Sequence, residues 1–150
     1  MEKNVLKIKN LKKTYHTKNK EILAVEDFSL NLKEGEFVSI VGPSGCGKST
    51  ILSILAELDN KSFGDIELTE KTRIGYMLQQ DALFDFRTVL DNCLLGLEIN
   101  KNLTNETKNY VLNLLKIYGL KDFINSYPAT LSGGMRQRVA LIRTLATKPD

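Results

Sequence analysis

Apolar residues alternate with polar ones in the first part of the chain, and this pattern predicts strands there. Residues 5–11 and 22–32 show the period of two that is typical of a strand with one solvent-exposed face. Residues 37–41 form a short apolar run of residue types that favour strands, as expected of a strand that is buried on both faces. Residues 66–68 and 73–78 are further candidates for strands.

Helical spacing replaces this alternation further along the chain. Apolar residues at positions i, i+3, i+4 and i+7 predict a helix that ends at residues 59–62. They are Ile51, Ile54, Leu55 and Leu58. From about Thr88 onward the pattern is helical, with Thr104 as the expected N-cap of a helix that Gly119 closes. Residues 135–147 are apolar on most sides and predict a buried helix.

The order of these elements predicts the fold class. Strands, then a strand, a loop and a helix, and then a helical block indicate an α/β core with an N-terminal antiparallel β subdomain and a helical insert. A length of 150 residues, with 42% hydrophobic and 26% charged residues, fits one soluble globular domain. No apolar run approaches the roughly 20 residues that span a bilayer, and residues 1–4 lack the apolar segment of a secretory signal. We therefore expect a cytoplasmic protein whose membrane attachment comes from a partner.

Charge and cysteine content change this picture little. The net charge is +3, and the basic residues near the N-terminus are Lys12, Lys13, Lys18 and Lys20. They could favour nucleic acid, but we interpret them as a solvated face near a polyphosphate site and expect no nucleic-acid partner. The two cysteines show no metal-ligand spacing, which predicts reduced thiols, with Cys93 as a small buried residue.

Residues 42–50 match the pattern G-x-x-x-x-G-K-[ST], which forms a phosphate-binding loop between a strand and a helix. The expected ligand-binding residues are Gly42, Pro43, Ser44, Gly45, Cys46, Gly47, Lys48, Ser49 and Thr50. Glycines let the backbone fold tightly, so that N–H groups converge on the phosphates at the positive end of the following helix. Lys48 would reach the β- and γ-phosphate oxygens. The Ser49 hydroxyl would complete a Mg²⁺ shell, and Thr50 would bond a further phosphate oxygen.

The alternative reading of this loop is a glycine-rich turn without a ligand. Its place between a predicted strand and an amphipathic helix, with the lysine and serine in register, favours the phosphate loop. Alone, the loop indicates only a purine nucleoside triphosphate, since kinases, GTPases and many ATPases share it.

A second glycine-rich segment narrows the choice. It reads Leu-Ser-Gly-Gly-Met-Arg-Gln-Arg over residues 131–138, and a helix is predicted to start just after its glycines. In isolation this would be an ordinary serine N-cap. At this spacing from Gly42 it resembles the signature motif of ATP-binding cassette (ABC) proteins. The resemblance implies that the segment contacts nucleotide through Ser132, Gly133, Gly134 and Gln137.

Smaller matches agree with this family. Tyr15 is placed like the family's adenine-stacking aromatic residue, although alone it reads as a half-buried strand residue. Gln79 follows a predicted strand, as the glutamine of the family's Q-loop does, and the resemblance gives it contact with Mg²⁺ and the attacking water. Gln80 is the less favoured choice, and either could be a solvated loop amide.

Within the family, the chain looks closest to ATPase subunits of importers for nitrate, sulfonates, taurine and related nutrients. That closeness is carried by residues 86–92, 96–98 and 131–138. Departures include Asp85-Phe86 in place of a usual Pro-Trp pair, and Glu57 in place of a common glycine. These departures lie outside the two glycine-rich segments, so the nucleotide site keeps its motif.

The resemblance also implies a mechanism and its partners. Two cassettes pair head-to-tail, so that ATP on the Lys48 loop of one is capped by the Ser132 segment of the other, and this closure drives a transmembrane permease subunit. A substrate-binding protein takes part indirectly, and the protein would lie on the cytoplasmic face of the membrane. Residues 1–150 are then the N-terminal part of a nucleotide-binding domain, with a helical subdomain at roughly residues 86–134.

The resemblance also predicts where the remaining catalytic residues of the family would lie. A Mg²⁺-orienting aspartate, a water-polarising glutamate and a γ-phosphate-contacting histidine normally follow the position of Asp150, in and beyond the Walker B motif. We therefore expect residues 1–150 alone to turn over ATP negligibly. The alternatives are a truncated regulatory or vestigial module that binds nucleotide without hydrolysis, and a soluble cassette acting on ribosomes or DNA.

Overall fold

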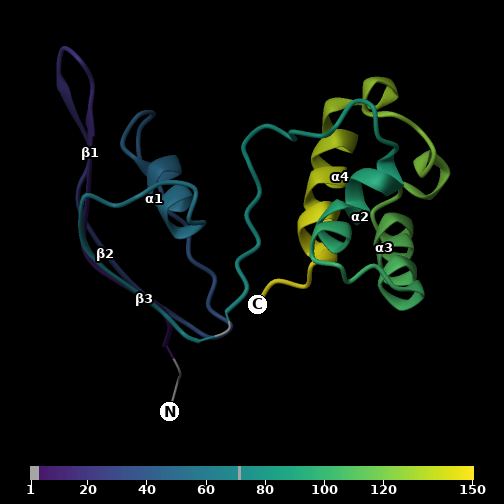
Figure 1. Ribbon diagram of the computed structural model, residues 1–150, viewed down its shortest axis with the longest axis horizontal. Helices are drawn as coiled ribbons and strands as arrows, with labels where there is room; N and C mark the ends of the chain where they lie inside the picture. The colour runs from purple at the N-terminus through teal and green to yellow at the C-terminus, as the bar shows by residue number, and fades with distance from the viewer. Residues whose placement is uncertain (1–3, 71) are drawn as a thin grey trace. The chain divides into compact units, whose positions relative to one another are not determined.

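The computed structural model describes residues 4–70 and 72–150, which divide into two compact units between Thr72 and Arg73. Figure 1 shows strands in the first unit and a group of helices in the second. The first unit contains β1 (Asn4–His16), β2 (Glu21–Lys33), α1 (Lys48–Leu55) and β3 (Phe63–Leu68). The second contains α2 (Val89–Ile99), α3 (Asn105–Ile117), two short 3-10 helices (Lys121–Phe123 and Pro128–Thr130) and α4 (Gly133–Ala146).

The first unit is an antiparallel sheet covered by one helix. Its three strands are ordered β2-β1-β3, and β1 pairs with both neighbours in antiparallel register. The predicted alternation is confirmed in β1, because Leu6 and Ile8 are buried while Lys9 is exposed. Ile8 lies opposite Leu30 in β2 and Ile66 in β3. α1 lies beside the sheet and buries Ile51 and Ile54 in the core (Figure 1). The buried apolar residues of this unit are Leu6, Ile8, Leu11, Val25, Ile51 and Ile54.

The helix predicted to continue to residues 59–62 ends earlier, at Leu55. Glu57 has a φ of 58°, in the left-handed region where an α-helix stops. The Leu58 amide then bonds the carbonyl of Ser53 at 2.9 Å, which closes the last turn. Glycine adopts this conformation without steric cost, so a left-handed φ at this position favours glycine over the glutamate that this chain has.

Two predicted strands are wrong: residues 37–41 and 73–78 are extended or irregular chain. Within the described residues neither segment pairs with a neighbouring strand, and a strand exists only when its N–H and C=O groups bond a partner. Phe37 and Val41 are consequently 92% and 90% exposed. The apolar pattern identifies chain that favours burial, but it does not supply the neighbour that would bury it.

The second unit confirms most of the predicted helices. Thr88 caps α2 by accepting a hydrogen bond from the Asp91 amide, and Thr104 caps α3 through a reciprocal pair with Thr107. α3 ends before Gly119, whose φ is 71°. The buried core consists of Val89, Cys93, Leu94, Leu97, Val111, Leu114, Leu115, Leu120, Leu131, Val139, Ile142 and Ala146.

α4 differs from its prediction in one respect. It spans Gly133–Ala146 and buries only one side, with Val139 and Ile142 fully inside. Arg136, Arg138 and Arg143 use the other sides to donate hydrogen bonds to neighbouring backbone carbonyls. Long basic side chains cover apolar surface with their stems, so the helix is amphipathic rather than buried all round.

Asn92 fixes the segment that leads into α2. Its side chain is fully buried, and Nδ2 donates to the carbonyls of Phe84, Arg87 and Thr88 at 3.1, 3.0 and 2.9 Å. Its Oδ1 accepts from the Phe84 amide at 2.8 Å. Because every polar atom of this buried amide is bonded, the turn over residues 84–88 is held in one conformation.

Candidate functional site

In the loop over residues 42–47, Gly45 and Gly47 adopt backbone conformations that residues with a side chain rarely adopt. Gly47 precedes α1 with a φ of 92°, and a Cβ there would lie 2.3 Å from the Ala24 carbonyl oxygen. Gly45 has a φ of 80°. At Gly42 the φ is ordinary for any residue, but a Cβ would lie 2.8 Å from Sγ of Cys46. Larger residues at Gly45 and Gly47 would therefore strain the loop backbone, whereas at Gly42 the Cys46 side chain would have to shift.

The start of α1 offers amides to an anion. The first four N–H groups of a helix have no partner within it, and no side chain caps this one. The helix dipole adds partial positive charge at the same end. Ser49, which we expect to bind Mg²⁺, lies exposed in the first turn with Thr50 beside it. These features fit a polyphosphate.

Lys48 supplies the full positive charge of the loop. Its Nζ donates to the carbonyls of Gly42 and Pro43 at 2.8 and 2.7 Å, and it lies 3.3 Å from Sγ of Cys46. The ammonium is thus held over the loop rather than extended away from it. This position beside the carbonyls of residues 42 and 43, at the loop that precedes α1, is what we expect of a lysine that binds phosphate.

The two cysteines have opposite environments, and the predicted burial of Cys93 is confirmed. Cys93 is fully buried in the helical core, and burial raises the pKa of its thiol to about 12, against a smaller lowering effect from Arg143. Cys46 is exposed in the phosphate loop. Cys93 therefore stays a neutral packing residue, and Cys46 is the accessible thiol of the described chain.

Tyr15 lies near the end of β1 with 37% of its surface exposed. Its hydroxyl donates to Oδ2 of Asp59 at 2.6 Å, and Nζ of Lys13 lies 4.6 Å from the centre of its ring. The family resemblance predicts that the Tyr15 ring can stack on a base. The structure adds that Asp59 bonds its hydroxyl and that the Lys13 ammonium lies near the ring.

The signature segment caps α4. Oγ of Ser132 accepts from the Met135 amide at 3.3 Å, which is the N-cap geometry expected of serine. A hydroxyl that accepts one hydrogen bond still has its own proton to donate. A Cβ at Gly133 would meet only Arg136 Nη2, at 4.0 Å, and one at Gly134 would meet nothing within 4 Å. Neither glycine has a φ in the left-handed region, so nothing in the described chain requires glycine there.

Gln79 and Gln137 are brought together in the second unit. Nε2 of Gln137 donates to the carbonyl of Gln79 at 3.2 Å, and the Gln79 residue is exposed. The backbone of Gln79, the glutamine expected to contact Mg²⁺, is therefore hydrogen-bonded to a side chain of the signature helix. Residues 42–50 belong to the first unit.

Sequence reasoning missed the contacts that hold the segment after Gln79 against α4. Nε of Arg136 lies 3.0 Å from Oδ2 of Asp81, and Arg143 donates to the carbonyls of Asp81 and Ala82, both at 2.8 Å. No sequence motif predicts these contacts, because the partners are more than 50 residues apart in the sequence. In the sequence the arginines resemble ordinary exposed helix residues.

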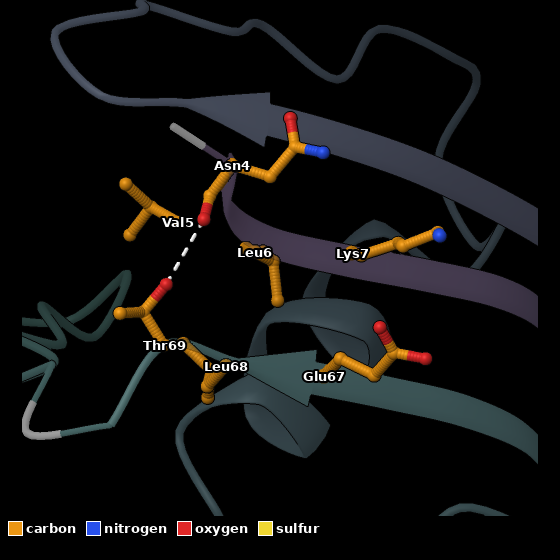
Figure 2. Close-up of a pocket in the computed structure, with 7 residues that line it drawn as sticks. All are labelled: Asn4, Val5, Leu6, Lys7, Glu67, Leu68 and Thr69. Atoms are coloured by element: carbon orange, nitrogen blue, oxygen red, sulfur yellow. Dashed lines mark hydrogen bonds between the residues drawn. The ribbon is translucent and has the colours of Figure 1, made fainter. Parts of the chain in front are cut away.

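Other features of the described residues do not make a site. No group of three or more acidic, histidine or cysteine side chains there could hold a metal ion, and no helix there is long and apolar enough to cross a bilayer. Figure 2 shows a pocket of about 260 Å³ between β1 and β3, with Thr69 Oγ1 donating to the Asn4 carbonyl. Its lining contains none of the residues proposed to bind nucleotide.

The sheet–loop–helix unit and its glycine cradle define a P-loop nucleotide-binding domain. A profile of the family described as ABC transporter matches residues 25–150. The chain therefore belongs to the ABC transporter family, as its ATP-binding domain.

Three similar proteins illustrate this membership. The uncharacterized ABC transporter ATP-binding protein YtlC of Bacillus subtilis is 45% identical over 97% of this chain and 58% of its own length. The methionine import ATP-binding protein MetN 2 of Bacillus cereus is 39% identical over 97% of this chain and 47% of its own. The dimeric, ADP- and Pi-bound cassette MJ0796 gives a TM-score of 0.82 at 38% identity, over 96% of this chain and 70% of its own. The chain thus spans about half the length of the curated relatives it matches.

Proposed function

We propose that this protein is the ATP-binding subunit of an ABC importer, which couples ATP binding and hydrolysis to solute uptake. The observation that carries the proposal is the loop at residues 42–50, which combines glycines of positive φ, an α1 start without a side-chain cap and the Lys48 ammonium held against the loop carbonyls. Membership of the ABC family supports transport as the process. Nothing observed favours the alternative of a regulatory module without hydrolysis.

Within this function the residues of the loop have separate tasks. The amides at the start of α1 bind phosphate oxygens, and Lys48 exchanges the carbonyls of Gly42 and Pro43 for β- and γ-phosphate oxygens. Mg²⁺, when bound, would neutralise charge that develops between these two phosphates. Ser49 and Gln79 are the proposed protein ligands of that ion, and Gln79 also orients the attacking water.

The signature segment is proposed to bind nucleotide held by a second copy of the chain. Gly133 and Gly134 meet no atom that would exclude a side chain, and neither has a positive φ. Two glycines at the start of α4 are understandable if an external group must approach the bare backbone. The Ser132 hydroxyl proton and Gln137 would then contact that nucleotide, as the dimeric arrangement of the similar cassette suggests.

The remaining partners follow from the same function. A transmembrane permease subunit would hold the protein at the cytoplasmic face of the membrane, and a substrate-binding protein would act indirectly. The narrower assignment to nitrate, sulfonate or taurine importers rests on the motifs at residues 86–92, 96–98 and 131–138. The methionine importer among the similar proteins shows that related cassettes serve other small nutrients.

Gly134→Asp separates the proposed role of the signature from its role in folding. An aspartate in the first turn of α4 faces open space and complements the helix dipole, so we expect unchanged or slightly higher thermal stability. The same carboxylate would repel the triphosphate of a second copy. Steady-state release of phosphate from Mg·ATP by the full-length gene product should therefore fall by about 100-fold.

Binding and stability measurements complete this test. ATP affinity of the Gly134→Asp monomer should stay within about twofold of the wild type, since the affected nucleotide lies on the other copy. Gly134→Ala, which adds bulk without charge, is the matched variant and should lose less activity. Unchanged hydrolysis in Gly134→Asp would show that the signature does not face a triphosphate.

A further inference from the structure

Tyr15 belongs to a hydrogen-bond network with Asp59 and Lys13 that no sequence motif predicts. Its hydroxyl donates to Oδ2 of Asp59 at 2.6 Å. The other carboxylate oxygen, Oδ1, accepts from Nζ of Lys13 at 2.6 Å. The same ammonium donates to the Asn60 carbonyl at 2.5 Å and lies 4.6 Å from the centre of the Tyr15 ring. The ring is thus anchored at its hydroxyl and flanked by a cation.

The charges of this network are matched. Lys13 is a buried charged residue, and burying a lysine is costly unless it is paired. The hydrogen bond from Lys13, and after it that from Tyr15, lowers the pKa of the Asp59 carboxyl below its ordinary value. The carboxylate therefore stays ionised at neutral pH and holds both partners at once.

The network lies close to the phosphate loop within the same unit. Gly47 packs against Ala24 and Val25 of β2, and Val25 lies opposite Lys13 in the sheet. Tyr15 follows two residues further along β1, about 7 Å away along the strand, and shares a face with Lys13. This spacing suits a ligand whose phosphates occupy the loop and whose flat base reaches the ring.

We propose that Lys13 and Asp59 are positioning residues that hold the Tyr15 ring as a stacking platform for the purine of a nucleotide. The inference rests on the proposed nucleotide-binding function and adds two residues to it. A ring fixed before binding loses no rotational freedom when a base stacks on it, so affinity rises. Because stacking does not read the edge of the base, adenine and guanine nucleotides should both benefit.

The test compares two ligands that share the phosphate chain and differ in the base. We would measure the affinities of Mg·ATP and of magnesium tripolyphosphate for the full-length protein by calorimetry. Asp59→Asn keeps the size of the side chain but removes its charge, and should weaken ATP binding about tenfold while changing tripolyphosphate binding less than twofold. Tyr15→Phe keeps the ring but removes the anchor, and should behave similarly.

The double variant and a control sharpen the outcome. If both residues act through one hydrogen bond, Asp59→Asn combined with Tyr15→Phe should be no weaker for ATP than the more affected single variant. Asp65→Asn, an exposed aspartate of β3 without contact to Tyr15, should change neither affinity. Lys13→Arg should retain the preference for ATP, since it keeps the charge that pairs with Asp59.

Different failures point to different causes. Equal weakening of ATP and tripolyphosphate by Asp59→Asn would show a general structural role and overturn the inference, as would unchanged binding of both. A wild-type protein that binds neither ligand would instead contradict the proposed function itself.

Discussion

Replacing Lys48 by alanine should reduce steady-state ATP hydrolysis by the full-length gene product about 100- to 1,000-fold. The Lys48 ammonium lies over the loop between the carbonyls of Gly42 and Pro43, where it supplies the full positive charge beside the helix amides. A triphosphate brings several negative charges to this point, and the amides alone carry only partial charge. The measurement is phosphate release at saturating Mg·ATP, together with ATP affinity by calorimetry.

A matched lysine on the same unit controls for the loss of charge. Lys9 is exposed on β1, in the part of the sheet near Asp65 rather than the loop, and Lys9→Ala should leave hydrolysis within about twofold of the wild type. If Lys48→Ala keeps more than half of the activity, the ammonium is not a phosphate ligand and the assigned site is wrong.

Gly47→Ala should destabilise the first unit by about 2–5 kcal/mol and abolish measurable ATP binding. Two effects add. The φ of 92° is unfavourable for any residue with a Cβ, and that Cβ would lie 2.3 Å from the Ala24 carbonyl oxygen and 2.9 Å from a methyl carbon of Val25. Because the nearest obstacle is backbone, relief requires the start of α1 to move from the sheet.

Gly35→Ala separates the two effects, since Gly35 has a φ of 75° but nothing within 4 Å of the added methyl group. It should cost only about 1–2 kcal/mol and leave ATP binding intact. Native-state hydrogen exchange at amides of β1 and β2 measures both losses in the folded protein. Equal losses in the two variants would show that the contact between Gly47 and β2 does not hold the loop.

Much of the fold follows from local pattern. The alternation in residues 5–11 and 22–32 predicts β1 and β2 because one face of each strand is buried against α1. The caps of α2 and α3 are readable because Thr88 and Thr104 bond amides three residues away, which is a purely local interaction. Features that depend on neighbours in sequence were therefore predicted well.

Features that depend on contacts between distant parts of the sequence were not predicted. Residues 37–41 and 73–78 have the composition of buried strands, but strand formation needs a partner that their own sequence does not specify. The early end of α1 arises from the left-handed conformation of Glu57, a residue type that does not signal it. The arginines of α4 look like solvent-facing charges until their bonds to Asp81 and Ala82 are seen.

The same difference between local and long-range contacts applies to the candidate site. The phosphate loop could be located because its glycines, lysine and serine are close together in the sequence, and the structure explains Gly45 and Gly47 by their positive φ. The network of Lys13, Tyr15 and Asp59 could not be predicted, because the aspartate is more than 40 residues from the other two. Contiguous motifs identify the chemistry, and the tertiary structure identifies the residues that position it.

A crystal structure of the full-length protein with Mg²⁺ and a non-hydrolysable ATP analogue tests most directly whether the amides around Lys48 hold a triphosphate. We predict the β- and γ-phosphates at the start of α1, with Nζ of Lys48 moved from the carbonyls of Gly42 and Pro43 to phosphate oxygens. An analogue bound elsewhere, or a loop left empty at millimolar concentrations of analogue, would contradict the assignment.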